Sequence, residues 1–191
     1  MLAWLRQRET LRQRARSLYG SIVTQARSPI LYRAWGVPDS NEGRFELITL
    51  HMVLALRRIG TEGEAGHVLG RALTELFVVD LDDTFREMSV GDLAVPRHVK
   101  RAVAVLYDRH AAYGAAFESG QESAKESALN EAVSATLGGL KGAEALDVAA
   151  ISSYIRQAGA ALDSQSGDAV LGGQLAWPEV QARSGEQTGA S

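Results

Sequence analysis

Carboxylates crowd into one short stretch, Asp80, Asp82, Asp83 and Glu87. If this stretch is helical, Asp80, Asp83 and Glu87 fall on one face, as ligands of Mg²⁺ or Ca²⁺ can. Arg86, however, follows Asp82 at the four-residue spacing of an ordinary helix ion pair. Because acidic residues on helices usually form a solvated or partner-facing surface, we expect a partner contact here and no metal site.

No other pattern predicts catalysis. The four histidines show no metal-ligand spacing such as HExxH, and no serine lies in a GxSxG elbow. The glycines of residues 60–66 lack the lysine of a phosphate-binding loop and lie among glutamates, which favours a turn between helices. With no cysteine, thiolate chemistry is excluded as well. We therefore predict a non-enzyme without a cofactor.

Arginines are concentrated at the start of the chain. Seven of them lie in residues 1–33 against the single acidic residue Glu9, although the whole chain carries a net charge of −3. Apolar residues recur between them at helical spacing, which predicts a basic amphipathic helix. Such a helix suits docking on anionic lipid head groups or on nucleic acid phosphates. The predicted docking residues are Arg6, Arg8, Arg12, Arg14 and Arg16.

Length and composition indicate one globular domain with tails: 191 residues, 46% hydrophobic and 23% charged. No run reaches the roughly 18 apolar residues of a membrane span, and the arginine-rich start does not resemble a secretory signal. The protein is therefore expected in the cytoplasm.

The elements that must position these residues are helices. Helical periodicity recurs along most of the chain, Gly60, Gly91 and Gly138 mark helix ends, and no strand pattern is visible. Spacings typical of capping boxes, Thr61 with Glu64 and Ser119 with Glu122, predict two helix starts. We expect an all-α bundle of five to seven helices, with a long ordered, apolar loop over 29–43 and a disordered tail after residue 163.

Several blocks of the sequence form a recognisable series: LYGSIVTQAR (18–27), Tyr32, GVPD (36–39), GRFE (43–46), His51, DLDD (80–83), FREM (85–88), VGDL (90–93), Val95-Pro96 and Val99-Lys100. In this order they resemble the ubiquinol–cytochrome c chaperone family, the assembly factors of the cytochrome bc1 complex. The resemblance covers roughly residues 17–118. It implies a non-enzymatic chaperone that binds newly made cytochrome b. The expected organisation is a docking helix (1–16), the chaperone domain (17–118), packed C-terminal helices (119–163) and a disordered tail (164–191).

This resemblance suggests which residues meet the client. Apolar residues of the loop offer surface to a membrane protein, and the acidic stretch complements the Lys and Arg of its cytoplasmic loops. The protein is then expected at the cytoplasmic face of the inner membrane, where the basic helix meets either anionic lipid or the ribosome. The predicted client-binding residues are Tyr32, Trp35, Val37, Arg44, Phe45, Asp80, Asp82, Asp83, Arg86 and Glu87.

Two other interpretations stay open. In the first, Tyr19, Tyr32, Trp35 and Phe45 are core residues, and Asp39, Arg44 and Asp92 are caps or form internal ion pairs. In the second, the chain is a helical DNA-binding regulator of the TetR type. That class needs a helix-turn-helix early in the chain, where Ser28-Pro29 and Val37-Pro38 interrupt the pattern, so no specific DNA binding is expected.

Overall fold

The computed structural model describes residues 2–88 and 91–181 and is all-helical over these ranges, as predicted. It has six long helices and two of five residues each. In chain order they are α1 (Leu2–Ala26), α2 (Pro29–Arg33), α3 (Asn41–Gly60), α4 (Gly63–Glu87), α5 (Val95–Glu118), α6 (Glu122–Thr136), α7 (Val148–Asp163) and α8 (Gly167–Leu171).

Helix α3 is the centre of the bundle. Ser40 caps its N-terminus, where the hydroxyl oxygen accepts a hydrogen bond from the backbone N–H of Gly43 at 3.1 Å. Most of its side chains are buried, and α1, α4, α5 and α7 all pack around it. Helix α4 lies close against α3 at Gly66, where an added Cβ would meet the Ile59 carbonyl oxygen at 2.0 Å. Glycine is therefore required for this helix crossing.

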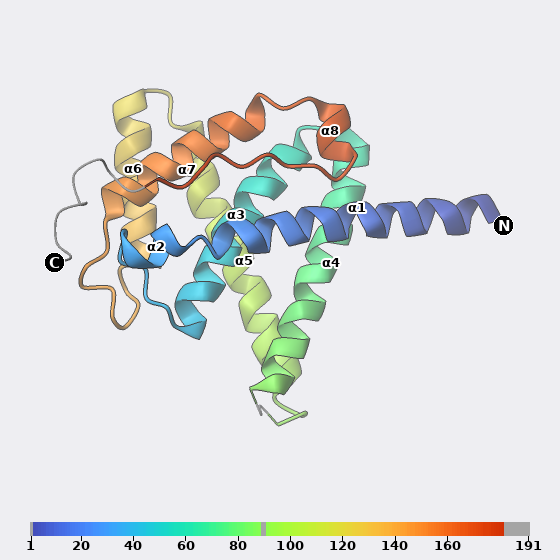
Figure 1. Ribbon diagram of the computed structural model, residues 1–191, viewed down its shortest axis with the longest axis horizontal. Helices are drawn as coiled ribbons and strands as arrows, with labels where there is room; N and C mark the ends of the chain where they lie inside the picture. The colour runs from blue at the N-terminus through green and yellow to red at the C-terminus, as the bar shows by residue number, and fades with distance from the viewer. Residues whose placement is uncertain (1, 89–90, 182–191) are drawn as a thin grey trace, which may run out of the picture.

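Two parts of the described chain project from this body (Figure 1). The N-terminal half of α1 extends to one side, and from residue 6 to residue 14 only Leu11 is partly buried. Helices α4 and α5 form an antiparallel pair, here called the arm, whose tip at residues 88 and 91–94 points away from the other helices. Both projections leave charged side chains in contact with solvent.

The segment after α2 is shorter than the predicted loop. The sequence predicts an ordered loop over 29–43, whereas Pro29 begins α2 and α3 already starts at Asn41, so residues 34–40 form the loop. Pro29 starts a helix because its fixed φ and missing N–H suit a first turn. Gly36 has a φ of +69° and lies so close to Ala145 that a Cβ would be 2.2 Å from its carbonyl oxygen. The loop is thereby packed against the segment before α7.

The prediction of a disordered tail from residue 164 was wrong for residues 164–181. Here α8 forms, and residues 172–181 run as an extended strap alongside α1 (Figure 1). The strap is fixed because Val180 is buried, the Trp177 indole donates to the Ser21 hydroxyl at 3.3 Å, and Gln25 donates to the Pro178 carbonyl at 2.9 Å. The rest of the predicted tail, residues 182–191, lies outside the described residues.

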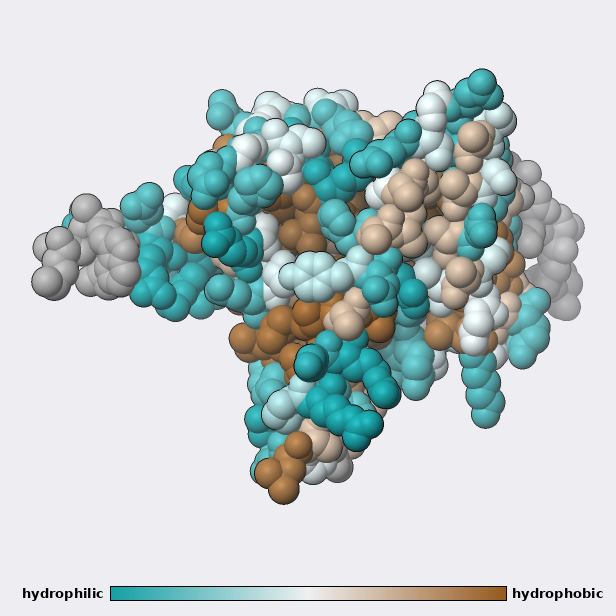
Figure 2. Space-filling view, turned by 180° about the vertical axis from the view of Figure 1, so that it is seen from behind, coloured by the Kyte–Doolittle hydropathy of each residue, from teal (hydrophilic) through white to brown (hydrophobic). Residues whose placement is uncertain are grey.

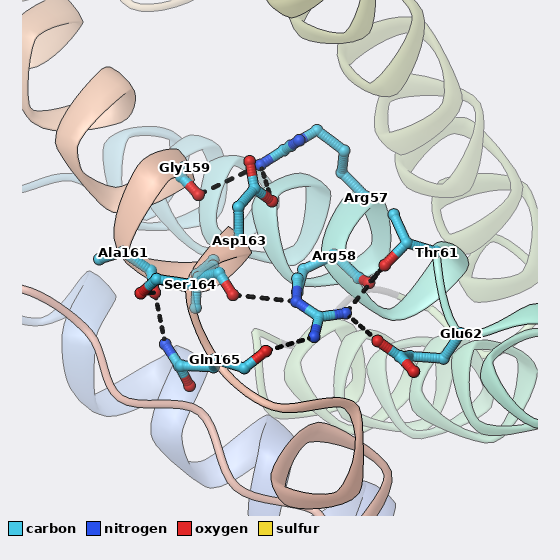
Figure 3. A network of polar contacts seen from close by, with 10 residues as sticks. Arg57, Arg58, Thr61, Glu62, Gly159, Ala161, Asp163, Ser164 and Gln165 are labelled. Atoms are coloured by element: carbon cyan, nitrogen blue, oxygen red, sulfur yellow. Dashed lines mark hydrogen bonds and ion pairs between the residues drawn. The ribbon is translucent and has the colours of Figure 1, made fainter.

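A buried arginine ties the end of α3 to the connection between α7 and α8 (Figure 3). The Nε of Arg58 donates to the Leu162 carbonyl at 2.9 Å, and one terminal nitrogen donates to the Gln165 carbonyl at 2.6 Å. Its other terminal nitrogen binds the Thr61 hydroxyl and the Glu62 carboxylate. Guanidinium suits this place because it spreads several donors in one plane toward carbonyls at helix ends.

Candidate client-binding surfaces

The apolar residues of the loop, predicted to meet a client, are mostly core. Trp35 and Val37 are 5% and 2% exposed, and the Trp35 ring packs on Tyr154 with centroids 5.7 Å apart. Tyr32 is half-buried, and its hydroxyl donates to the Ala26 carbonyl at 2.9 Å. In this conformation Trp35 and Val37 present almost no surface to a client, because their side chains belong to the buried core.

Arg44 and Phe45 open α3 beside this loop. Arg44 is exposed and its Nε binds Asp39 at 2.7 Å, which lowers the pKa of that carboxyl and raises the pKa of the guanidinium. Phe45 is partly buried and stacks on Phe77 of α4, with centroids 6.3 Å apart. The interpretation of these residues as internal contacts describes their geometry well.

The acidic stretch lies on the arm, and its carboxylates have different neighbours. Asp80 accepts a hydrogen bond from the Tyr19 hydroxyl of α1 at 2.7 Å, so burial and this acidic partner together raise the tyrosine pKa. Asp82 and Asp92 both bind Arg86, at 2.6 and 2.8 Å. Asp80 and Asp82 therefore already have partners within the chain.

Asp83 and Glu87 are exposed, and in the described part of the chain no ion pair engages them. They follow Asp80 at spacings of three and seven residues, so they share its side of α4, the side that faces α1. We call Asp80, Asp83 and Glu87 the acidic stripe. Among residues 2–88 and 91–181 no group of three His, Asp or Glu side chains has a metal-binding arrangement. The stripe is therefore suited to cationic groups of a partner.

A groove on the opposite side of the molecule was missed by sequence reasoning. It lies between α3, α4 and α5, has a volume of about 910 Å³, and its lining surface is largely apolar. Val79 and Tyr107 in its walls are 56% and 66% exposed, unusual values for large apolar side chains. Figure 2 shows apolar surface gathered across the middle of this face. The groove therefore offers apolar surface that is open to solvent.

The rim of this groove is polar. Arg57 lies over the Phe117 ring at 4.4 Å and binds Asp163 at 2.7 Å. His67, Arg71 and His110 are exposed at the same end of the groove. An apolar floor with a polar rim is the usual composition of a peptide-binding groove. The signal in the sequence was a second pair of apolar residues on α4, Val78 and Val79, beside the buried line Leu69, Leu73, Phe77 and Leu81.

The arginines predicted to dock lie on the projecting part of α1, and all are exposed. Arg8, Arg12 and Arg16 follow one another at four-residue spacing and form a stripe, whereas Arg6 and Arg14 lie on other sides of the helix. Arg16 also contacts Glu9 at 3.5 Å. No helix in residues 2–88 and 91–181 combines the length and apolar composition that crossing a bilayer requires.

Known proteins match most of the chain. The family model described as ubiquinol-cytochrome C chaperone matches residues 33–177, well beyond residue 118, where the resemblance in the sequence was expected to fade. No curated protein matches. A solved structure, the crystal structure of the Cbp3 homolog from Brucella abortus, is 28% identical with a TM-score of 0.80, and the match covers 94% of this chain and 98% of that chain. The chain thus belongs to the ubiquinol-cytochrome C chaperone family.

Proposed function

We propose that this chain is a non-enzymatic assembly chaperone that binds newly made cytochrome b and supports assembly of the cytochrome bc1 complex at the cytoplasmic face of the inner membrane. Family membership supports the chaperone role. The single observation that carries the client site is the apolar groove between α3, α4 and α5. A membrane protein awaiting its partner subunits exposes apolar helix surface, and a groove of this composition buries such surface.

The acidic stripe supports the same proposal through charge. Cytoplasmic loops of membrane proteins are enriched in Lys and Arg, and Asp83 and Glu87 are exposed carboxylates without an ion pair among the described residues. Complementary charge accelerates encounter and selects the correct partner more than it adds affinity. We assign the groove to holding the client and the stripe to orienting its basic loops.

Photo-crosslinking tests the groove. A photoreactive residue is placed at Val79 or Tyr107, which line it, and as a matched control at Gln157 on the exposed side of α7. Crosslinking in cells that assemble the bc1 complex is expected to join cytochrome b to the groove positions and not to the control. Equal crosslinking at all three positions, or none to cytochrome b, would contradict a client site in the groove. A strain without the gene is expected to lose assembled complex.

The arginines of α1 are assigned to docking on anionic lipid. Sedimentation with vesicles and with ribosomes compares the natural chain with a variant in which Arg8, Arg12 and Arg16 are replaced by Gln. We expect the variant to lose vesicle binding, most clearly at low salt, because lipid phosphates attract these side chains through screened charge. Loss of ribosome binding with unchanged vesicle binding would move the docking surface to ribosomal RNA.

The TetR-type alternative is not retained. The family match supports a chaperone, and the two helices that follow α1 provide no pair suited to a helix-turn-helix, since α2 has only five residues. We therefore propose no specific DNA contact.

A further inference from the structure

Among residues 6–88 and 91–181, exposed large apolar side chains occur only on the arm and at its tip. They are Val68, Val79, Met88, Leu93 and Tyr107. Val79 and Tyr107 belong to the groove, whereas Met88 and Leu93 lie outside its lining, at the tip, where the Met88 sulfur accepts a hydrogen bond from the Asn41 amide of α3 at 3.9 Å. Leu93 is 101% exposed, which means that its side chain contacts almost nothing in the protein. Apolar surface at the end of a projecting element is typical of an interaction site.

The first two turns of α5, next to this tip, carry a cationic face. Arg97, Lys100 and Arg101 are exposed, and Lys100 and Arg101 follow Arg97 at spacings of three and four residues, so all three lie toward one side of the helix. No ion pair engages any of them within residues 2–88 and 91–181, and the first turn of α5 holds no acidic residue. The opposite side of α5 is buried through Val95 and Ala102. Three cations are thus held outward on a fixed helix.

The acidic residues of the arm do not neutralise this face. Asp82 and Asp92 form ion pairs with Arg86, and Asp80 accepts a hydrogen bond from Tyr19. The exposed carboxylates of Asp83 and Glu87 lie on α4, on the side that faces α1. Close to the tip, the unpaired acidic residues Asp83 and Glu87 therefore lie on α4, and the unpaired basic residues Arg97, Lys100 and Arg101 lie on α5.

We propose that the tip of the arm is a membrane contact, in which Leu93 and Met88 enter the head-group region of an anionic bilayer and Arg97, Lys100 and Arg101 bind lipid phosphates. An apolar tip flanked by cations matches the interface of a bilayer, where apolar side chains meet acyl chains just below the phosphates. Anionic lipid is favoured over a protein partner because Leu93 stands alone at a tip and offers no pocket or continuous face to pack against.

This contact is separate from the docking assigned to α1. The tip of the arm and the N-terminal half of α1 are the two parts that project from the body, in different directions (Figure 1). Two contacts on one membrane fix the orientation of the protein, whereas a single helix leaves it free to turn. The groove would then be held at a defined angle to the bilayer from which its client emerges.

The absence of cysteine allows a direct test. Leu93→Cys is labelled with an environment-sensitive fluorophore, and Gln157→Cys on α7 is the matched control. With vesicles of phosphatidylcholine containing one quarter phosphatidylglycerol, emission at position 93 is expected to rise and shift to the blue, and emission at position 157 to stay unchanged. Vesicles of phosphatidylcholine alone are expected to give a much weaker change at position 93.

Vesicle sedimentation then tests the cations. Replacing Arg97, Lys100 and Arg101 by Gln, with α1 intact, is expected to lower affinity for anionic vesicles at least tenfold, since each cation near such a surface contributes about fivefold. The control replaces Arg71, Lys141 and Arg156, exposed elsewhere, and is expected to change affinity less than twofold. Unchanged vesicle binding of the tip variant overturns the proposal. So does unchanged emission from the fluorophore at position 93 on protein that sediments with the vesicles. Crosslinking of detergent-solubilised cytochrome b to a photoreactive residue placed at Tyr107 tests the client site independently of membrane binding.

Discussion

His51 and Tyr154 form a hydrogen bond inside the core, with 2.7 Å between the imidazole Nε2 and the phenol oxygen. The other ring nitrogen, Nδ1, lies 2.7 Å from the Leu47 carbonyl, which can only accept. Nδ1 therefore carries the proton, and Nε2 accepts the hydrogen bond from Tyr154. Gln25 of α1 donates to the same phenol oxygen at 3.0 Å. The neutral imidazole of α3 is thus connected to Tyr154 of α7 and, through the phenol oxygen, to Gln25 of α1.

This histidine makes stability depend on pH. Complete burial lowers the pKa of His51 to about 4, from about 6.5 in an unfolded chain. The unfolded chain then binds the extra proton between these values, so the free energy of unfolding is at its full value above pH 6.5 and falls as pH drops toward 4. The loss approaches about 3 kcal/mol. Urea unfolding across this range measures it.

The variant His51→Gln is the control for that prediction. Glutamine does not titrate, so the difference in unfolding free energy between the two proteins should shrink as pH falls from 6.5 to 4. Carboxylates contribute equally to both proteins in this range and cancel. If the unfolding free energies of the two proteins instead changed in parallel with pH, His51 would titrate normally in the folded protein.

Glu46 and Arg109 predict a second stability effect. Two guanidinium nitrogens of Arg109 in α5 bind the two carboxylate oxygens of Glu46 in α3, at 2.8 and 3.0 Å, and Glu46 is largely buried. Arg109→Gln leaves the carboxylate unpaired and is expected to cost about 3 kcal/mol in thermal or urea unfolding. Arg44→Gln, which breaks the solvent-exposed pair with Asp39, should cost much less, because water screens the interaction. Similar losses in both variants would contradict this ranking.

Arg58 predicts local rather than uniform loosening. Arg58→Lys keeps the charge but cannot reach the carbonyls of Leu162 and Gln165 together with Thr61. We expect amide hydrogen exchange to accelerate at least tenfold over residues 163–181, while α5 and α6 stay close to the natural chain. Arg71→Lys, at an exposed site on α4, is the matched control and should change neither region. Uniform acceleration in all helices would show that Arg58 supports the whole fold.

Client capture is predicted to depend on the groove more than on α4 as a whole. Val79→Asp places a charge in the groove wall, and we expect recovery of cytochrome b in pull-downs to fall at least fivefold, with little change in melting temperature because Val79 is exposed. Val68→Asp makes the same change on the same helix outside the groove lining and should leave capture intact. Equal capture by both variants would remove the groove from the client site.

Helix content and the core were predictable from the sequence because helical periodicity reports burial directly. The positions at which helices start were harder to predict. Thr61 and Glu64 have the spacing of a capping box, yet Thr61 ends α3, and its hydroxyl donates to the Arg58 carbonyl at 2.8 Å. Ser119 likewise follows the end of α5, and Gln121 precedes α6. The same spacing of Ser or Thr and Glu can occur at the start or at the end of a helix, and tertiary contacts decide which of the two forms.

The surfaces were harder to predict than the helices. Trp35 looked like client surface because large apolar residues in a loop need a partner, and the sequence could not reveal that α7, over a hundred residues later, supplies it. The groove was missed for the opposite reason, because Val79 and Tyr107 lie in helices among other apolar residues, and nothing in the sequence marks them as exposed. Periodicity shows which residues are apolar, and only tertiary structure shows which of them stay uncovered.

The strap over α1 also sets an order of events during synthesis. Gln25 and Ser21 bind Pro178 and Trp177, and Gly173, with a φ of +88°, lies against the backbone of Arg14. A ribosome makes α1 first and the strap near the end, so the first helix lacks these contacts until about residue 180 has left the exit tunnel. Shortening the chain before the strap would therefore affect its earliest helix rather than its last.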